Sequence, residues 1–345
     1  MKHVLAPNWR SPIRWSQKFR TEVLETRDGT EQRIALRSLP EIEWDYGVSV
    51  WKERFHDLRR FLVSNQGSKV FVPHPIKSLP LLEVLPEEKE SGKQLVSDVA
   101  EYSVKLQQLD RKNEDVDAAF VPVQFEGLDV FDFKPNYVSG LNVEDIARRE
   151  LVEFGRGSLR LYRPIEYHTR NQRLQFLSRS AEEARRIASF FFRAKGRQRE
   201  FYAPTWQHDI AMTGVSLPGS YIISVAGTDF ASTYAQTTVF TAIQIRYAND
   251  FVSRHTIQKI EVAGSNSDIY LDQPIPLALT AQSAPTISWM PRSRFSSDRM
   301  TVEWLTNGVA RIVADTMTLS RSPLGGSDEQ VSGYGLNYGN AYGGL

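Results

Sequence analysis

One pattern occurs twice in this chain: an amphipathic helix stops at a glycine and is followed by a short aromatic strand that ends in proline. The clearer copy is Ser180–Ile210, SAEEARRIASFFFRAKGRQREFYAPTWQHDI, and the fainter copy is Ser49–Ile76, SVWKERFHDLRRFLVSNQGSKVFVPHPI. Segments with the alternation of β-strands precede each copy. A duplicated β-rich module suggests a building block, because two similar domains per chain can occupy equivalent places around a ring axis.

In the fainter copy, the apolar spacing predicts a helix over 51–65, with Ser49 as its N-cap and Gly67 as its stop signal. Its side chains at helical spacing should belong to a structural core. They are Trp51, Phe55, Leu58 and Leu62.

In the clearer copy, the sequence predicts a helix over 181–195. Ser180 and Glu183 have the spacing of a capping box, and Gly196 is a natural terminator. Ile187, Phe191 and Phe192 belong to the apolar face. We also expect two aromatic residues that follow the helix to be structural: Phe201 in a strand and Trp206 in its loop.

The rest of the chain is predicted to be mainly β, with β-barrel or sandwich modules that each have one flanking helix. Asp28-Gly29 and Asn307-Gly308 are strong two-residue hairpin signals between alternating runs. We divide the chain into a first module over 1–140, a second module with the C-terminal strands over 141–320, and a tail over 321–345.

The composition excludes several classes of chemistry. The chain has 345 residues and no cysteine, so it has no disulfide, thiolate nucleophile or cysteine-bound metal. Its net charge of +1 provides no global field that would attract nucleic acid or an anionic membrane. No apolar run approaches the roughly 20 residues of a membrane span. The absence of cysteine fits assembly in a reducing cytoplasm. The first residues lack the apolar region of a signal peptide, so we expect the protein to be made and used without export.

A search for catalytic patterns yields little. No two of the six histidines have metal-ligand spacing, and GRGSLR at 155–160 lacks the ending of a phosphate loop. We interpret His208-Asp209 as part of a loop. The members of a Ser–His–Asp triad are distant in a chain, but no Gly-x-Ser-x-Gly elbow points to one. We therefore expect no enzyme activity, cofactor or metal.

Two carboxylate pairs could in principle support acid–base chemistry or bind calcium. Glu41 and Glu43 have strand spacing and share a face, whereas Asp129 and Asp132 lie near a tight turn, where a shared face does not follow. Such pairs are more often a solvated surface, and we interpret both in that way.

Basic residues gather on and after the second helix. Arg193, Lys195, Arg197 and Arg199 are candidates for an interface with acidic groups of a neighbouring subunit, or for a lining beside passing DNA. Arg185 and Arg186 belong to the same cluster. The polar face of an amphipathic helix requires such charges too, although Arg197 and Arg199 lie beyond the helix. The sequence favours neither interpretation.

The tail over 321–345 is rich in glycine and tyrosine and has no helix or strand period. Its glycines lose much conformational entropy on ordering, so it should not fold alone. Tyr334, Tyr338 and Tyr342 recur every four residues and offer amphipathic contact area. We expect these tyrosines to become ordered against a neighbouring subunit or the next ring of an assembly.

Three segments resemble tail-tip proteins of bacteriophages with long non-contractile tails. Ala188–Ile210 is similar to a segment of distal tail and minor tail proteins. In that segment an aromatic helix end, here Phe190-x-x-Arg193, leads through Gly-Arg, here Gly196-Arg197, to an aromatic strand and a Trp-containing loop. Thr26–Trp44 resembles their N-terminal hairpin, and Ser293–Leu319 resembles their C-terminal strands. These motifs are structural rather than catalytic.

The resemblance implies a structural virion protein of a siphophage, located at the tail tip after assembly in the host cytoplasm. It would form a ring between the tail tube and the baseplate hub. Its partners would be the tail tube protein, hub and tail-tip or fibre proteins, and the tape measure protein, with DNA only passing through. Its own copies would form a trimer with pseudo-sixfold symmetry or a hexamer.

The family's tube-like domains are β-barrels or sandwiches with a flanking helix, which agrees with the two modules. Simple distal tail proteins often have one such domain and an appendage, so two copies leave the stoichiometry open. Two other classes also remain open: a receptor- or carbohydrate-binding tail protein, and a cell-envelope hydrolase. Exposed aromatic side chains beside a groove would favour the first, and a pocket with a perturbed carboxylate or histidine would favour the second.

Overall fold

The computed structural model describes most of the chain between residues 12 and 319. The described ranges are 12–25, 31–65, 67–74, 81–87, 91–96, 99–109, 120–137, 141–146, 150–154, 158–162, 169–280, 285–306 and 308–319. Within them the fold is mainly β, as predicted, with three helices. The predicted turn residues Asp28, Gly29 and Asn307 lie outside the described residues, as does the tail with Tyr334, Tyr338 and Tyr342.

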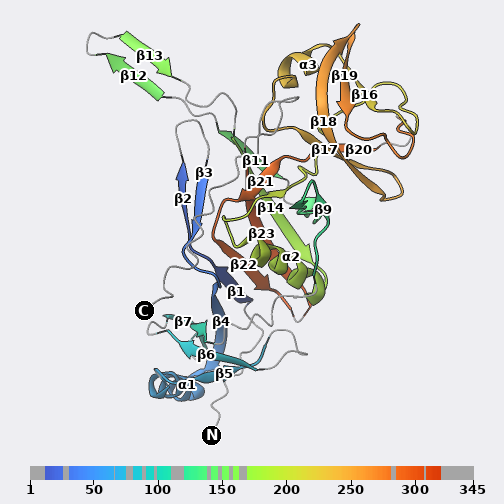
Figure 1. The fold of residues 1–345 in the computed structure, drawn as a ribbon. Helices are drawn as coiled ribbons and strands as arrows, with labels where there is room; N and C mark the ends of the chain where they lie inside the picture. The colour runs from blue at the N-terminus through green and yellow to red at the C-terminus, as the bar shows by residue number, and fades with distance from the viewer. Residues whose placement is uncertain are drawn as a thin grey trace, which may run out of the picture.

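The chain contains two copies of one arrangement of strands, each with a helix after its longest early strand (Figure 1). The first copy consists of β1 (Ile13–Lys18), β2 (Thr21–Glu25), β3 (Glu31–Ala35), β4 (Glu41–Trp51), α1 (Lys52–Ser64), β5 (Val70–Val72), β6 (Leu82–Pro86), β7 (Ser91–Val96) and β8 (Val99–Gln108). The second consists of β11 (Asn142–Ile146), β12 (Glu150–Phe154), β13 (Ser158–Tyr162), β14 (Thr169–Ser178), α2 (Ala181–Ala194), β15 (Phe201–Tyr202), β21 (Arg292–Phe295), β22 (Arg299–Trp304) and β23 (Ala310–Thr318).

Within each copy, corresponding strands pair with corresponding partners in the same register. In each copy the long strand before the helix pairs with the last strand, the first strand pairs with that long strand, and a hairpin joins the last two strands. The pair Glu43–Gln107 of the first copy corresponds to Asn171–Met317 of the second. Ser16–Glu43 of the first copy likewise corresponds to Glu144–Asn171 of the second. Ser91–Ser103 of the first copy corresponds to Thr301–Val313 of the second. Because one residue of slip would turn every side chain to the other face, this agreement identifies the copies as a structural repeat.

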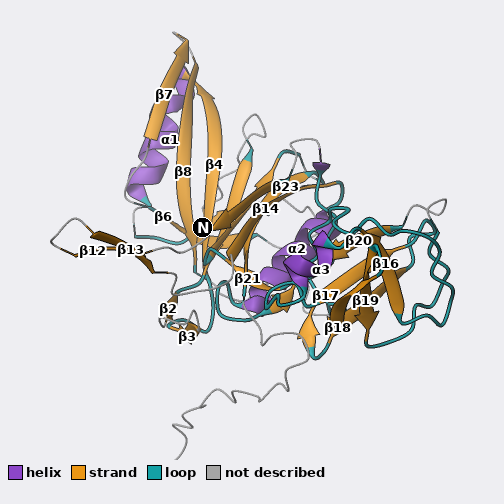
Figure 2. Ribbon diagram, turned by 90° about the horizontal axis from the view of Figure 1, so that it is seen from above, coloured by secondary structure: helices purple, strands orange, loops and turns teal. Residues whose placement is uncertain are grey.

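The two helices also occupy corresponding places. Helix α1 packs against β4 and β8, and helix α2 packs against the matching strands β14 and β23 and also against β22. Figure 2 shows α1 lying along β4 and β8 and α2 lying along β14 and β23. The repeated sequence pattern therefore corresponds to a repeated packing arrangement.

Rather than forming two sheets, the copies merge into one. Strand β1 of the first copy pairs with β4 on one side and with β22 of the second copy on the other. The result is a 12-stranded antiparallel sheet with six strands from each copy, curved as a half-barrel. One hydrophobic core continues from Ile13 through both copies to Ala314.

A separate small domain is inserted into the second copy between β15 and β21. It contains a five-stranded sheet and a core of its own. Its elements are β16 (Ile222–Ala226), α3 (Asp229–Tyr234), β17 (Ala242–Arg246), β18 (Val252–Ala263), β19 (Asn266–Leu271) and β20 (Thr286–Trp289). The Ala203 N–H donates to the Pro291 carbonyl at 3.1 Å, so the insertion starts and ends at adjacent points.

Two short strands, β9 (Gln124–Phe125) and β10 (Leu128–Asp129), form a tight hairpin in the segment between the copies. Its two-residue turn contains Glu126 and Gly127, both with positive φ, as expected of a tight hairpin. The hairpins β2–β3 and β12–β13 follow the first strand of each copy. In Figure 1, β12–β13 projects from the body of the molecule.

Helix α2 begins at the predicted residue and ends at Ala194, one residue before the predicted end. The Ser180 hydroxyl accepts a hydrogen bond from the Glu183 N–H at 3.1 Å. After Ala194, Lys195 and Gly196 both adopt positive φ, and the Gly196 N–H donates back to the Phe191 carbonyl at 3.4 Å. These contacts satisfy backbone groups that a helix end leaves without intrahelical partners.

Helix α1 corrects one prediction about its start. The N-cap is Trp51 rather than Ser49, and no side chain caps the helix. Ser49 is still part of β4, where it pairs with Glu101 of β8, so its backbone is committed to the sheet. The strand therefore runs directly into the helix.

Most of the predicted core side chains are buried: Leu62, Ile187, Phe191, Phe201 and Trp206. Leu58 and Phe192 are half-buried against the same core, and the side chain of Phe55 lies outside the described part. Trp51 is a correction, because it is 60% exposed. It ends β4, whose buried positions are Ile42, Trp44, Tyr46 and Val48, and so it falls on the opposite face of the strand.

Candidate functional site

The two copies meet where β1 and β22 pair edge to edge. Across this ladder the hydroxyl oxygens of Ser16 and Thr301 lie 3.0 Å apart. Beside them, Arg14 donates to the Glu303 carboxylate at 3.2 Å, and Arg311 of β23 donates to it at 2.8 Å. Burial opposes the charged form of Glu303, but Arg311 and Arg14 outweigh it and lower the pKa of this carboxyl. The side chains on this face are thus matched across the ladder.

Strand β3 of the first copy is tied to the second copy by ion pairs. Arg294 makes a two-pronged contact with Glu31, with both N–O distances at 2.7 Å and both side chains only 6% exposed. Glu200 accepts from Arg33 on the first copy and from Arg292 on the second. Burial would raise the pKa of Glu200, but the two guanidinium groups reverse this effect and lower it. Paired geometry of this kind specifies one arrangement of the copies.

Asp298, in the turn before β22, binds two backbone N–H groups with its carboxylate. Thr21 of the first copy donates at 2.6 Å, and Arg197 after α2 donates at 2.9 Å. The carbonyl of Asp298 accepts from the Phe19 N–H at 2.8 Å. A Cβ at Gly196 would lie 2.5 Å from the Asp298 carboxylate, so only glycine fits this crossing without a shift.

The segment after β1 also covers the end of α2. The ring of Phe19 lies 5.8 Å from that of Phe191 and 6.0 Å from that of Phe192, measured between centroids. We call the whole contact the internal joint: β1, the segment 19–21 and β3 of the first copy against α2, β21 and β22 of the second. It combines a strand ladder, buried ion pairs and aromatic packing.

The structure places the predicted interface cations at two different sites. Arg197 belongs to the internal joint, where its guanidinium donates to the Thr21 carbonyl at 2.6 Å. Arg193 pairs with Asp129 at 3.3 Å beside the β9–β10 hairpin. Lys195 is half-buried at the helix end, and Arg199 is exposed. Arg193 and Arg197 therefore bind acidic or carbonyl groups of their own chain.

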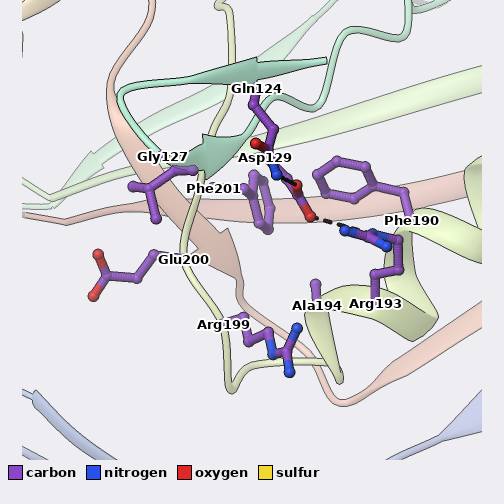
Figure 3. A pocket seen from close by; sticks show the side chains of 10 residues that line it. Gln124, Gly127, Asp129, Phe190, Arg193, Ala194, Arg199, Glu200 and Phe201 are labelled. Atoms are coloured by element: carbon purple, nitrogen blue, oxygen red, sulfur yellow. Dashed lines mark hydrogen bonds and ion pairs between the residues drawn. The ribbon is translucent and has the colours of Figure 1, made fainter. Parts of the chain in front are cut away.

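A cleft of about 380 Å³ lies between α2 and the β9–β10 hairpin. Figure 3 shows Arg193 pointing at Asp129, which also accepts from Gln124 at 3.3 Å. The rings of Phe190 and Phe201 form its apolar part. The cleft combines a paired charge with aromatic walls, an arrangement that suits packing as well as the binding of a polar group.

His208 and Asp209 have different surroundings. The Asp209 carboxylate accepts from the Thr205 hydroxyl and, at 2.9 Å, from the Trp289 N–H. Burial raises the pKa of Asp209, although these bonds favour its charged form. The exposed His208 lines a separate cavity of about 330 Å³ with Trp206. The geometry agrees with the interpretation that this segment is a loop closed by Asp209.

Each carboxylate of the two predicted pairs forms an ion pair with an Arg or Lys side chain of the same chain. Glu41 contacts Arg37, and Glu43 contacts Lys18 and Arg299. Asp129 contacts Arg193, while Asp132 accepts from Arg254 at 2.5 Å. Within the described part of the chain, no group of three or more His, Asp or Glu side chains is arranged to hold a metal ion.

Comparison with known proteins does not connect this arrangement to a family. No family model matches the sequence, and the curated proteins include no match to it. None of the helices in the described ranges has the length and apolar character needed to cross a membrane.

Sequence reasoning missed the acidic residues of the internal joint, among them Glu31, Glu200, Asp298 and Glu303. Each is bound by groups from the other copy, and the Glu31–Arg294 contact spans 263 residues. Their sequence neighbourhoods contain no distinguishing motif. The usable signal was the repeat itself, because aligned copies would have indicated which strands meet.

Proposed function

We propose that this chain is a structural subunit of a ring at the distal end of a phage tail, which joins the tail tube to the baseplate hub and host-recognition proteins. The observation that carries this proposal is the pair of matched copies joined edge to edge in one curved sheet. A subunit that already contains two equivalent units is suited to occupy two places around an axis.

The resemblance of three segments to tail-tip proteins supplies the biological setting of the proposal. Two of these segments contribute to the internal joint: 188–210 contains the end of α2 and Glu200, and 293–319 contains β22 and β23. The third segment, 26–44, includes β3 with Glu31 and Arg33. The resemblance therefore involves the residues that hold the copies together.

The mass of the purified full-length chain, measured in native conditions at micromolar concentration, tests the proposal. We expect a closed homo-oligomer of three chains, in which six copies surround a channel. A hexamer would retain the ring and replace its stoichiometry. A monomer that does not assemble when tail tube protein is added would contradict the proposal.

The proposal includes a structural role without catalysis, and two assays distinguish it from the alternatives. We expect the pure protein to leave peptidoglycan and capsular glycan intact, and release of sugar fragments would favour the hydrolase class. Glycan binding would favour the carbohydrate-binding class. Of the tryptophans in the described ranges, Trp51 alone is exposed, and Trp15, Trp44, Trp206, Trp289 and Trp304 are buried. This burial provides little for an exposed sugar platform.

A further inference from the structure

The repeat gives β1 and β11 the same place in their copies but different surroundings. Strand β1 lies between β4 and β22, and most of its residues are buried. Strand β11 pairs with β14, and within the described residues no strand pairs with its other side. Four of the five residues of β11 are exposed. A hollow of about 550 Å³ beside it is lined by residues 141–144.

The same contrast holds for the partner strand. Strand β22 lies between β23 and β1, whereas its counterpart β7 pairs with β8, and no other described strand pairs with it. The sheet therefore ends in β11 at one edge and has β7 as an open strand in the other copy. Strand β11 is the counterpart of β1, and β7 is the counterpart of β22; β1 and β22 are the strands that pair in the internal joint.

We infer that β11 of one chain pairs antiparallel with β7 of a second copy of this chain, in the register of the internal joint. This inference rests on the proposed function, because it names the contact that would close the ring. An open strand offers unpaired N–H and C=O groups, and a strand from another chain can satisfy them. The contact is head to tail, and head-to-tail contacts generate closed rings when the rotation closes.

The internal ladder fixes the register of the external one. Ser16 pairs with Thr301 in the internal joint, and the matching positions are Glu144 and Ser91. The internal pair of Arg14 and Glu303 likewise corresponds to Asn142 and Lys93. We call the inferred contact between β11 of one chain and β7 of the next the external joint, and Asn142 and Lys93 face each other in it.

Other parts of the first copy are open where the second copy is covered. In the second copy, the last turn of α2 is covered by Phe19, and a Cβ at Gly196 would meet Asp298. In the first copy, Val63 in the last turn of α1 is 52% exposed, and a Cβ at Gly67 would have no atom within 4 Å. The end of α1 is therefore open at the place where the end of α2 is covered.

An ion pair that occurs in both copies is also covered in the second copy and open in the first. Glu200 and Arg292 of the second copy correspond in register to Lys69 and Glu83 of the first, with the charges exchanged. Arg33 of the first copy covers the pair in the internal joint. The counterpart residue Lys69 remains 66% exposed. By this equivalence, the neighbour's β12–β13 hairpin would approach Lys69 and Glu83.

Cysteine cross-linking tests the register, because the native chain has no cysteine. Facing residues of an antiparallel ladder have Cα atoms about 4.5–5.5 Å apart, within the range that a disulfide spans. Equal amounts of Ser91→Cys and Glu144→Cys full-length chains are mixed and oxidised. Since each chain has one cysteine, a disulfide between the two variants forms only between chains. In a ring assembled at random from both variants, about one joint in four carries both cysteines, so we expect about half of the chains to become cross-linked dimer.

Two matched controls fix the interpretation. In the first control, Gly92→Cys replaces Ser91→Cys in the mixture with Glu144→Cys. The cysteine in β7 is then shifted by one residue and its side chain lies on the opposite face of the sheet, so we expect at least a tenfold lower yield of cross-linked dimer. The double variant Ser16→Cys with Thr301→Cys should form a disulfide within one chain and leave the mass of a monomer under denaturing conditions.

The outcomes separate this inference from the proposed function. An oligomer by native mass that gives no Ser91–Glu144 cross-link, while the internal control oxidises, would overturn the β7·β11 joint and leave the ring in place. An equal yield from the shifted pair would overturn the register. A chain that stays monomeric, alone and with tail tube protein, would overturn both the joint and the ring.

Discussion

The ends of helices α1 and α2 lie at corresponding places in the repeat but have very different environments. The end of α2 is enclosed by Phe19 and Asp298 of the internal joint and by an aromatic cluster. Within this cluster, the rings of Phe190 and Phe201 lie 5.1 Å apart. The end of α1 has Val63 exposed and open space beside Gly67. The same backbone arrangement thus tolerates a dense and an open surrounding, and the difference follows from what lies next to each copy.

The largest expected effect is at Phe191. Its side chain is 1% exposed in the continuous core, so Phe191→Ala should reduce the free energy of unfolding by about 3–5 kcal/mol. Val63→Ala at the open end of α1 should change it by less than about 0.5 kcal/mol. Urea unfolding of both variants measures the difference. Equal effects would mean that the two helix ends are not differently enclosed.

The two glycines after the helices should respond next most strongly. Gly196→Ala should cost about 2–4 kcal/mol, because a positive φ strains alanine and the new Cβ meets the Asp298 carboxylate. Gly67→Ala has the strain alone and should cost about 1 kcal/mol. Thermal or urea unfolding of the monomeric state compares them. A smaller loss at Gly196 than at Gly67 would contradict the crossing described here.

The third comparison concerns the exchanged ion pairs. Glu200→Gln should cost about 1.5–3 kcal/mol at pH 7, whereas Glu83→Gln on the exposed counterpart pair should cost less than about 1 kcal/mol. The pKa of Glu200 is lowered from its ordinary value of 4.5, so its stabilising effect is present above that pH and is lost as the pH falls through the lowered pKa.

The deficit of Glu200→Gln relative to the native protein should therefore shrink between pH 7 and pH 3. Unfolding free energies measured across this range provide the check, with Glu83→Gln as the reference at each pH. A deficit that stays constant with pH would show that the charge of Glu200 is not what ties the copies.

The repeat could be predicted from the sequence because it depends on local signals. The capping residues Ser180 and Glu183, the stop glycines and the spacing of Ile187 and Phe191 each act within one or two turns of chain. The alternation in β4 likewise indicated a strand before the first helix. The start of α1 was misjudged because pairing of Ser49 with β8 overrides its preference for an N-cap position.

The internal joint could not be predicted, since its contacts join residues that are far apart in sequence. Nothing near Glu31 indicates that it will meet Arg294, and the two alone do not define a motif. The inserted domain was also hidden, because its strands alternate in the same way as the strands around it. The pairing of β15 with β21 and the meeting of Ala203 with Pro291 show where the insertion interrupts the second copy.

The position of that insertion has a consequence for symmetry. The two copies share strand order and register, but only the second contains the five-stranded domain, between β15 and β21. In any closed assembly that continues the internal joint, the inner sheet would repeat once per copy, whereas the inserted domain would repeat once per chain. The assembly would then have twice as many equivalent positions along its sheet as projecting domains. A ring of such chains can thus connect a component whose rotational symmetry has an even order to a component whose symmetry has half that order.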